Sequence, residues 1–416
     1  MADGPRTAPG APVTGAAPQA AGPVTGAAPQ AAGPVAGTLA GGVAKVADQV
    51  AGVHADDVDA RARFPEETFA ALAASGALGA LVPAALGGPG ADLIEVAESV
   101  AALGRQCASS AMVLAMHHIQ VACLARHGRT PALELLTAGL IERPLLLASA
   151  TTEVGIGGDV RSSRCALERD GDRFRLVKEA PVISYGAQAD AVLVTARRDG
   201  DSPPNDQVLV VCRPPGLELE QVTEWDTLGF RGTCSPGFVL RATGSADEVF
   251  PDPYADISAR TMLPVAHVLW SAVWWGIASA AAQRARTYVQ AAARRTPGTP
   301  PEAARRVAEL LAVLGQLADS VRSGARRFDD ARDDPETLSS VGFALAMNSL
   351  KVSASTLVVD VVHRSMQVCG MAGYRNGGPY ALGRHLRDAL GAALMVNNDR
   401  ILGNNAQLLL VHRGVE

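Results

Sequence analysis

The spacing of apolar residues divides the chain into three parts. In residues 39–144, apolar positions recur with a period near 3.6, which is typical of amphipathic helices. Pro65, followed by two acidic residues, marks the start of one helix, and the glycine-rich run PAALGGPG at 83–90 interrupts the pattern. Two further helices are predicted within 91–128. The first part is therefore expected to be an N-terminal helical domain.

Residues 145–254 follow a different pattern. Short runs of β-branched residues are bounded by Gly, Pro, Asp and Asn, which predicts strands. A turn at Gly171 and Asp172 joins two of these runs, and the sequence DGDSPPND at 199–206 is predicted to be an exposed hairpin loop. We expect a small antiparallel β-domain in this middle part.

Residues 255–416 return to the helical period, with long amphipathic runs that suit an antiparallel bundle. The predicted fold is therefore α+β, mostly α, with a sheet between two helical parts. Residues 1–38 stand apart, because they are rich in Ala, Pro and Gly and contain the sequence PVTGAAPQAAG twice, at 12–22 and 23–33. Such a composition buries too little apolar surface to offset chain entropy, so we expect a disordered tail.

Composition narrows the class of protein. The 416 residues are 48% hydrophobic and 19% charged, with a net charge of -5 and scattered basic residues, which argues against nucleic-acid binding. Six cysteines lie far apart without metal-ligand spacing, so we expect free thiols, no metal site and a cytoplasmic location. The most apolar stretch, Met262 to Ala282, contains Pro264 and His267, and we interpret it as a buried helix rather than a membrane span.

Four motifs carry the candidate chemistry. They combine glycines, which let a backbone approach a ligand closely, with hydroxyls, amides and arginines, which bind polar groups and phosphates. In chain order they are TTEVGIGGDV at 151–160, KEAPVISYGAQAD at 178–190, DTLGFRGTCSPGFVL at 226–240 and MQVCGMAGYRNGGPYALGRHLRDA at 366–389.

Together these motifs resemble those of the acyl-CoA dehydrogenase family of flavoproteins, over roughly residues 40 to 413. The resemblance implies that family's fold, in which the C-terminal part is a four-helix bundle. It implies a flavin, with FAD expected rather than FMN, because the fourth motif matches the family's diphosphate-binding loop. In the family this loop reaches the FAD of a neighbouring subunit, so a homo-oligomer, dimer or tetramer, is expected.

The resemblance also assigns roles to individual residues. At the flavin ring it places the loop residues of the first motif, and Ser184 on the hydroxyl that bonds flavin N5. Val182 replaces an indole that usually packs on the ring. The full set of implied cofactor residues is Thr151, Thr152, Gly157, Gly158, Ser184, Arg294, Gln367, Gly370, Gly373, Asn397 and Asn398, and the implied substrate-binding residues are Arg231 and Tyr374.

The family's catalytic base is missing from its usual positions. Family dehydrogenases remove the acyl α-proton with a glutamate, and the matching positions here hold Val396 or, in the minority arrangement, Ala266. Asp399 and His267 are the two candidate substitutes. Each has a structural alternative: Asp399 as a helix cap or an ion-pair partner of Arg400, and His267 as a core histidine.

Three functions follow from these observations. Our primary prediction is oxidation of an acyl thioester, carried by CoA or an acyl-carrier protein, at the α,β-carbons, with electrons passed to an acceptor. The alternative is a flavin monooxygenase that hydroxylates, N-oxygenates or epoxidises a secondary-metabolite intermediate, using flavin reduced by a separate supplier. Val182 and Val396 favour this alternative. The third is a pseudoenzyme subunit that binds flavin without catalysis, or binds none.

Overall fold

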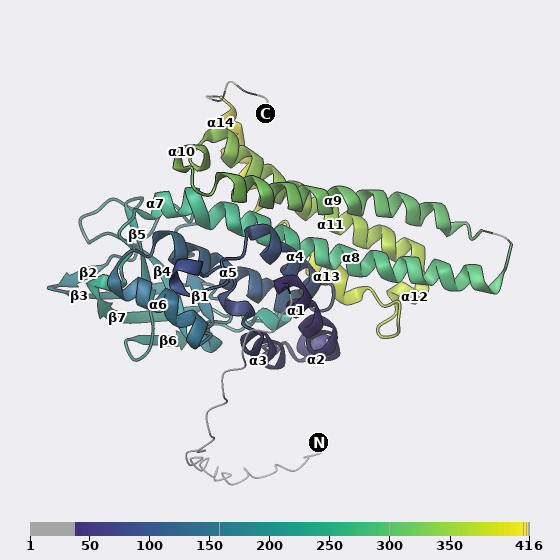
Figure 1. Ribbon diagram of the computed structural model, residues 1–416, viewed down its shortest axis with the longest axis horizontal. Helices are drawn as coiled ribbons and strands as arrows, with labels where there is room; N and C mark the ends of the chain where they lie inside the picture. Colours follow the sequence, from purple (N-terminus) through teal and green to yellow (C-terminus); the bar gives the residue numbers. More distant parts are fainter. Residues whose placement is uncertain (1–37, 158, 299, 411, 413, 415–416) are drawn as a thin grey trace, which may run out of the picture. The chain divides into compact units, whose positions relative to one another are not determined.

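The computed structural model describes residues 38–157, 159–298, 300–410, 412 and 414. Apart from Thr38, the predicted tail lies outside the described residues, and so does Gly158 of the first motif. The described residues form one compact unit, in which helices come first, then strands, then helices again. The fold class, helices on either side of a sheet region, is confirmed (Figure 1).

Six α-helices are described in the N-terminal part from residue 38 onward. Thr38 accepts a hydrogen bond from the Gly41 N–H and caps the first of them. The predicted helix start after Pro65 is confirmed, because α3 begins at Glu66 and has its two acidic residues in the first turn. The helices are α1 (Leu39–Val46), α2 (Gly52–Arg61), α3 (Glu66–Ala74), α4 (Leu93–Gly104), α5 (Ala108–His127) and α6 (Pro131–Glu142).

The start of α4 is capped from a distant part of the chain. Asp329, in the C-terminal helix α9 (Ala303–Ala331), accepts hydrogen bonds from the backbone N–H groups of Leu93 at 2.8 Å and Ile94 at 3.1 Å. These N–H groups have no partner within their own helix, so the carboxylate satisfies donors that would otherwise stay unpaired. The cap joins the N-terminal and C-terminal helices.

Seven strands in the described residues form two sheets. The strands are β1 (Leu147–Ala150), β2 (Glu168–Asp170), β3 (Arg173–Ala180), β4 (Ala191–Arg197), β5 (Gln207–Cys212), β6 (Leu217–Gln221) and β7 (Phe238–Ser245). One sheet has the order β1-β4-β5 and the other β2-β3-β7-β6. The turn at Gly171 and the hairpin loop at 199–206 are found where they were predicted.

The expectation of a wholly antiparallel β-domain was wrong in one place. β1 pairs with β4 in parallel, with Leu147 opposite Ala191. Between these strands the chain leaves the sheet to form β2 and β3 in the other one, and such a crossover is what lets two strands run in the same direction. β4 and β5 are buried along nearly their whole length, which fits a sheet covered on both faces.

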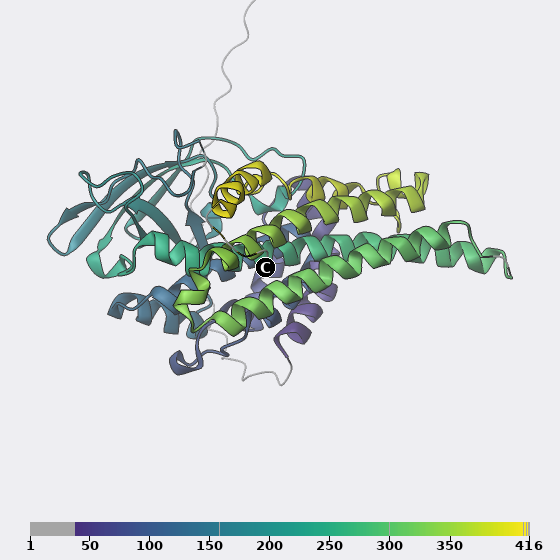
Figure 2. The ribbon, with the colours of Figure 1, turned by 90° about the horizontal axis from the view of Figure 1, so that it is seen from above.

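The C-terminal part is a helical bundle, as predicted. Its three long helices, α8, α9 and α11, run side by side in both views (Figures 1 and 2). The last stretch is broken into two short helices by a run of turns at 391–397. The helices are α7 (Tyr254–Ile257), α8 (Leu263–Arg295), α9, α10 (Pro335–Leu338), α11 (Val341–Cys369), α12 (Met371–Tyr374), α13 (Gly383–Leu390) and α14 (Asn398–Leu409).

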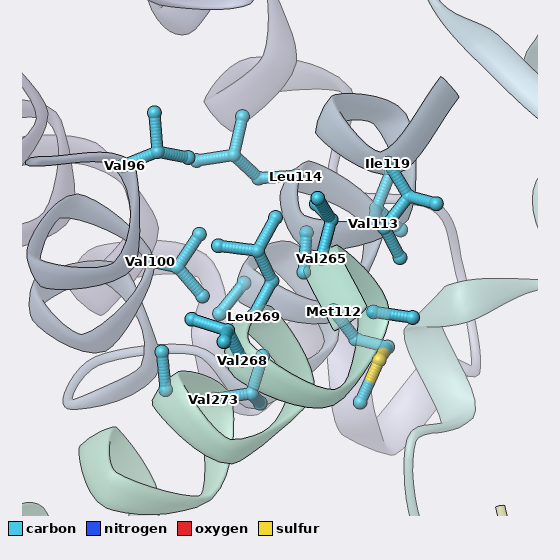
Figure 3. Packing of buried hydrophobic residues seen from close by; sticks show 14 of the residues in the cluster. Val96, Val100, Met112, Val113, Leu114, Ile119, Val265, Val268, Leu269 and Val273 are labelled. Atoms are coloured by element: carbon cyan, nitrogen blue, oxygen red, sulfur yellow. The ribbon is translucent and has the colours of Figure 1, made fainter. Parts of the chain in front are cut away.

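Helix α8 is the centre of the core. It packs against α4 and α5 of the N-terminal part and against α9 and α11 of the bundle. Figure 3 shows Val265, Leu269 and Val273 of α8 facing Val100 of α4 and Met112 of α5. Because one helix serves both helical parts, they share a single core.

In the described part of the chain, three helical stretches are long and apolar enough to cross a membrane by length and composition. They are 108–127, 254–295 and 341–369, and their most apolar windows are 89%, 89% and 44% buried within the protein. Only part of the second stretch, Met262 to Ala282, stands out as most apolar in the sequence. For the first two, burial in the shared core accounts for the apolar composition. The absence of a membrane partner stays a prediction.

Two glycines, Gly104 of α4 and Gly276 of α8, lie where these helices cross. A Cβ at Gly276 would lie 2.5 Å from the carbonyl oxygen of Ala101 and 2.8 Å from the backbone of Gly104. Neither neighbour is a flexible side-chain end, so the two helix backbones can approach this closely only because residue 276 has no side chain.

We predict that Gly276→Ala destabilises the protein by about 1–3 kcal/mol, because the helices must separate to admit one methyl group. Urea unfolding followed by circular dichroism measures the effect. Gly315→Ala in α9 is the matched control, since a Cβ there meets nothing within 4 Å, and it should stabilise the protein by up to about 1 kcal/mol. Equal effects of the two substitutions would contradict the close-contact argument.

Candidate functional site

An apolar cavity of about 620 Å³ lies where all three parts of the chain meet. Met112 and Met116 of α5 and Trp270 of α8 form part of its wall, and Trp225 and Phe230 contribute from the loop after β6. Hydroxyl groups gather on the β-domain side: Ser149, Thr151, Thr152, Ser184, Thr233 and Ser235. We call residues 390–396 the roof segment, of which Leu390, Gly391, Leu394, Met395 and Val396 line the cavity.

The hydroxyls form a connected chain. Ser235 Oγ donates to Ser184 Oγ at 2.9 Å, and the hydroxyls of Thr233 and Ser235 are 2.8 Å apart. Because Ser184 accepts from Ser235, its own hydroxyl hydrogen remains available for an acceptor inside the cavity. Ser184 therefore presents a donor at the wall.

A tight turn holds Ser184 in place. β3 ends at Ala180, and the chain leaves the sheet at Pro181. Proline has no N–H for a strand ladder. The backbone N–H groups on either side of Ser184 instead bind the loop after Phe230, from Ile183 to Pro236 O at 3.0 Å and from Tyr185 to Thr233 O at 2.8 Å.

A buried ion pair anchors the first motif. Glu153 Oε2 lies 3.4 Å from Lys178 Nζ, and the carboxylate also accepts from the Ser163 hydroxyl and the Cys165 N–H, both at 2.7 Å. Burial acts to raise the pKa of Glu153, but these partners outweigh it and the pKa lies below its ordinary value. This pair was not predicted from the sequence, although Lys178 occupies an inward position of the alternating strand β3.

A second polar clamp holds the loop that carries Trp225 and Phe230. Arg387 donates to Asp59 Oδ1 of α2 at 3.0 Å and to Leu228 O at 2.8 Å, and Asp388 Oδ1 accepts from the Phe230 N–H at 2.7 Å. Burial raises the pKa of Asp388 to about 6. The Arg-Asp-Ala motif therefore joins the N-terminal helices, the β-domain loop and α13 through side chains to which the sequence assigned no role.

The cavity contains part of the predicted cofactor set. Thr151, Thr152 and Ser184 line it, as do the two departures from the family pattern, Val182 and Val396. Gly157 lies in the same loop as Thr151 and Thr152, and its carbonyl accepts a hydrogen bond from Arg400.

A row of hydroxyls facing apolar walls suits a planar ring system with one polar edge, so the residues present fit a flavin ring. Among the described residues, no group of three or more His, Cys, Asp or Glu side chains is placed to hold a metal ion.

The predicted diphosphate-binding residues lie apart from this cavity. Gln367 and Gly370 are exposed at the end of α11, and Arg294 is exposed in the last turn of α8. Tyr374, which was predicted to bind substrate, is also exposed, in α12. Gly370 has φ +55°, a conformation that favours glycine. Gly373 is buried, and a Cβ there would lie 2.8 Å from the Cβ of Cys369.

Three other predicted residues make contacts within the protein. Asn397 caps α14 by accepting from the backbone N–H groups of Asp399 and Arg400. The side chain of Asn398 is bound by Lys351 and Ser355 of α11. Arg231 donates to the carbonyls of Asp59 and Thr227, and so supports the loop rather than lining the cavity.

Neither candidate base lines the cavity. Asp399 is exposed in the first turn of α14, where Asn397 is the N-cap residue. His267 is 2% exposed in α8, and neither ring nitrogen has a hydrogen-bond partner within the described protein. Burial, together with the nearby charge of Lys351, lowers the pKa of His267 to about 4. The structure thus places a neutral imidazole in the core, beside Trp270.

Comparison with known proteins gives two family matches. Residues 38–132 match the family model for the acyl-CoA dehydrogenase N-terminal domain, and residues 258–398 match the model for the C-terminal domain. The chain is 26% identical to the probable acyl-CoA dehydrogenase fadE25 of Mycobacterium leprae, covering 81% of this chain and 85% of that protein. It is 29% identical to the amino sugar nitrososynthase DnmZ of Streptomyces peucetius, covering 82% and 84%.

Solved structures also share the fold. The dibenzothiophene monooxygenase TdsC of Paenibacillus sp. A11-2 superposes with a TM-score of 0.76 at 19% identity, over 90% of this chain and 97% of that one. The similar proteins therefore carry names from both dehydrogenase and monooxygenase chemistry, and the similarity alone does not choose between them.

We predict that His267→Leu makes the protein less sensitive to acid. The histidine takes up a proton near pH 6.5 when unfolded but only near pH 4 when folded, so wild-type stability falls as pH drops through this window. Between pH 7 and 5 the leucine variant should lose about 2 kcal/mol less stability than the wild type in urea unfolding. The same substitution at the exposed His363 should leave the pH dependence unchanged. An unaltered pH dependence in the His267 variant would contradict the buried, unpaired imidazole.

Proposed function

The chain belongs to the acyl-CoA dehydrogenase family, and from that premise we propose that it is a flavin-dependent monooxygenase of a small, largely apolar substrate. The family consists of flavoprotein oxidoreductases, which gives the cofactor class and the general reaction. The choice of oxygenation rests on the chemistry of the cavity.

The observation that carries the proposal is the aliphatic roof. Leu394, Met395 and Val396 line the cavity where the sequence resemblance expects the catalytic glutamate. Dehydrogenation of a thioester needs a base within hydrogen-bond reach of the α-carbon, and these side chains cannot remove a proton. Oxygenation by a flavin does not need a carboxylate at this position.

A bound, reduced flavin would supply two electrons and activate O2. One oxygen atom enters the substrate and the other leaves as water. The residues of this chain position the reactants and exclude water. Ser184 presents a hydroxyl hydrogen at the polar wall, and Trp225 and Trp270 offer flat apolar surfaces for the substrate. Val182 lines the cavity where the resemblance implies an indole on the flavin ring, and its smaller side chain would leave room for O2 to approach a bound flavin.

Dehydrogenation of an acyl thioester is the second candidate. The resemblance of the whole chain to proteins named acyl-CoA dehydrogenases supports it. It requires Asp399 to move from the surface into the cavity, or His267 to act from the core, and it would use a separate electron acceptor. The thioester could be carried by CoA or by an acyl-carrier protein.

The cofactor and assembly follow from the same premise. We propose FAD, because the fourth motif matches a diphosphate-binding loop, although TdsC has been solved with FMN. We also propose a homodimer or tetramer, because the loop around Gly370 and Tyr374 is exposed and the resemblance implies that it reaches the flavin of a second copy. Six unpaired cysteines support a reducing, cytoplasmic location.

We predict that the purified protein binds flavin and oxygenates a small apolar compound when supplied with a flavin reductase, NADPH and O2. The first probes are indole, which forms a solved complex with TdsC and FMN, and dibenzothiophene, for which TdsC is named. Mass spectrometry with ¹⁸O2 should show one labelled oxygen atom in the product. Titration with FAD and FMN identifies the preferred flavin.

The competing functions give different results in a paired anaerobic experiment. Bleaching of the oxidised flavin by a panel of acyl-CoA thioesters, with loss of the effect in Asp399→Asn or His267→Gln, would establish dehydrogenation and overturn the proposal. Absence of flavin binding would leave the pseudoenzyme. The exposed Asp319→Asn serves as the matched control for Asp399→Asn.

A further inference from the structure

The roof segment contains a conformation that valine rarely adopts. Val396 has φ +45°, in the left-handed region, and its side chain lines the cavity. A β-branched residue there is a genuine outlier, because its branched Cβ crowds the backbone. Such a conformation persists only where the surrounding structure imposes it.

One buried side chain of α11 holds this turn. Lys351 is fully buried, and its ammonium donates to the carbonyl oxygen of Val396 at 2.7 Å and to Asn398 Oδ1 at 2.7 Å. The amide of Asn398 in turn donates to Ser355 Oγ at 3.0 Å, one turn further along α11. Lys351 therefore binds both ends of the short run from Val396 to Asn398.

Val396 O and Asn398 Oδ1 are the hydrogen-bond acceptors of the buried Lys351 ammonium. The ammonium also lies 5.6 Å from the ring centroid of the buried Trp274, a cation–π contact. Burial lowers the pKa of Lys351 to about 8. A lysine held in such surroundings would be costly without its acceptors, so the lysine and the turn stabilise each other.

We propose that Lys351 is a positioning residue that sets the shape of the substrate cavity through Val396. By fixing the strained turn, it keeps the aliphatic roof closed over the hydroxyl wall and so limits which ring-shaped substrates fit. Lys351 does not itself line the cavity, so it acts only through the roof segment. The inference rests on the proposed function in taking this cavity as the substrate site.

Hydrogen exchange measured by mass spectrometry tests whether Lys351 holds the turn at Val396, without substrate or flavin. Lys351→Met keeps the apolar stem but removes both hydrogen bonds, and should raise exchange in residues 391–398 at least tenfold while leaving residues 207–212 of β5 unchanged. In a Val396→Gly background the same substitution should raise exchange less than threefold, because glycine adopts the left-handed conformation without being held. Ser355→Ala, which loses the Asn398 contact and the bond to Val352 O of its own helix but leaves both Lys351 bonds, should change exchange less than twofold.

A binding measurement tests whether Lys351 affects which substrates the cavity accepts. Calorimetry with indole as the probe, on the flavin-loaded protein, should show at least fivefold weaker binding in Lys351→Met and less than twofold weaker binding in Ser355→Ala. Equal exchange in residues 391–398 of the wild type and Lys351→Met, or a uniform rise across the protein, would overturn the positioning role. Absence of indole binding by the wild type would count against the proposed substrate class, while the exchange result would still decide the role of Lys351.

Discussion

Three parts of this chain meet at one guanidinium and one buried carboxylate. Arg387 joins the loop after β6 to α2, and Asp388 holds the backbone of Phe230. Gly229 lets the loop approach so closely that a Cβ there would lie 2.4 Å from the Arg387 carbonyl oxygen. The cavity exists only while these contacts hold the N-terminal helices, the β-domain loop and α13 together. Its walls come from each of these parts, and none of them encloses it alone.

Hydroxyl-bearing and apolar side chains line different sides of the cavity. On the β-domain side, hydroxyl groups line the cavity. The ion pair of Glu153 and Lys178 anchors the first motif, and hydrogen bonds from Thr233 through Ser235 hold Ser184. On the side of the bundle the lining is aliphatic and aromatic apart from Arg387. In a low-dielectric enclosure a fixed hydroxyl acts more strongly than it would in water. A substrate that enters meets one directed polar edge, the charged Arg387 and otherwise a largely apolar surface.

The fold was largely predictable from the sequence because it depends on local patterns. The helical period, the Pro65 start and the Gly171 turn each describe a few neighbouring residues, and each was confirmed. The parallel pairing of β1 with β4 was not predictable in this way, since direction depends on where the chain travels between them. The family motifs indicated Thr151, Thr152 and Ser184, which line the cavity. The roles of Lys351, Asp388 and Glu153 were missed, because their partners lie far away in the sequence and no spacing rule connects them.

The cap on α4 has a consequence for the order in which the chain can become structured. The carboxylate of Asp329 that satisfies the Leu93 and Ile94 N–H groups belongs to α9, more than two hundred positions later in the sequence. During synthesis these two N–H groups of α4 stay hydrated until α9 has left the ribosome. A fragment ending before residue 329 would leave the Leu93 and Ile94 N–H groups to water, with only the local capping box of Asp92 and Glu95 at the start of this helix.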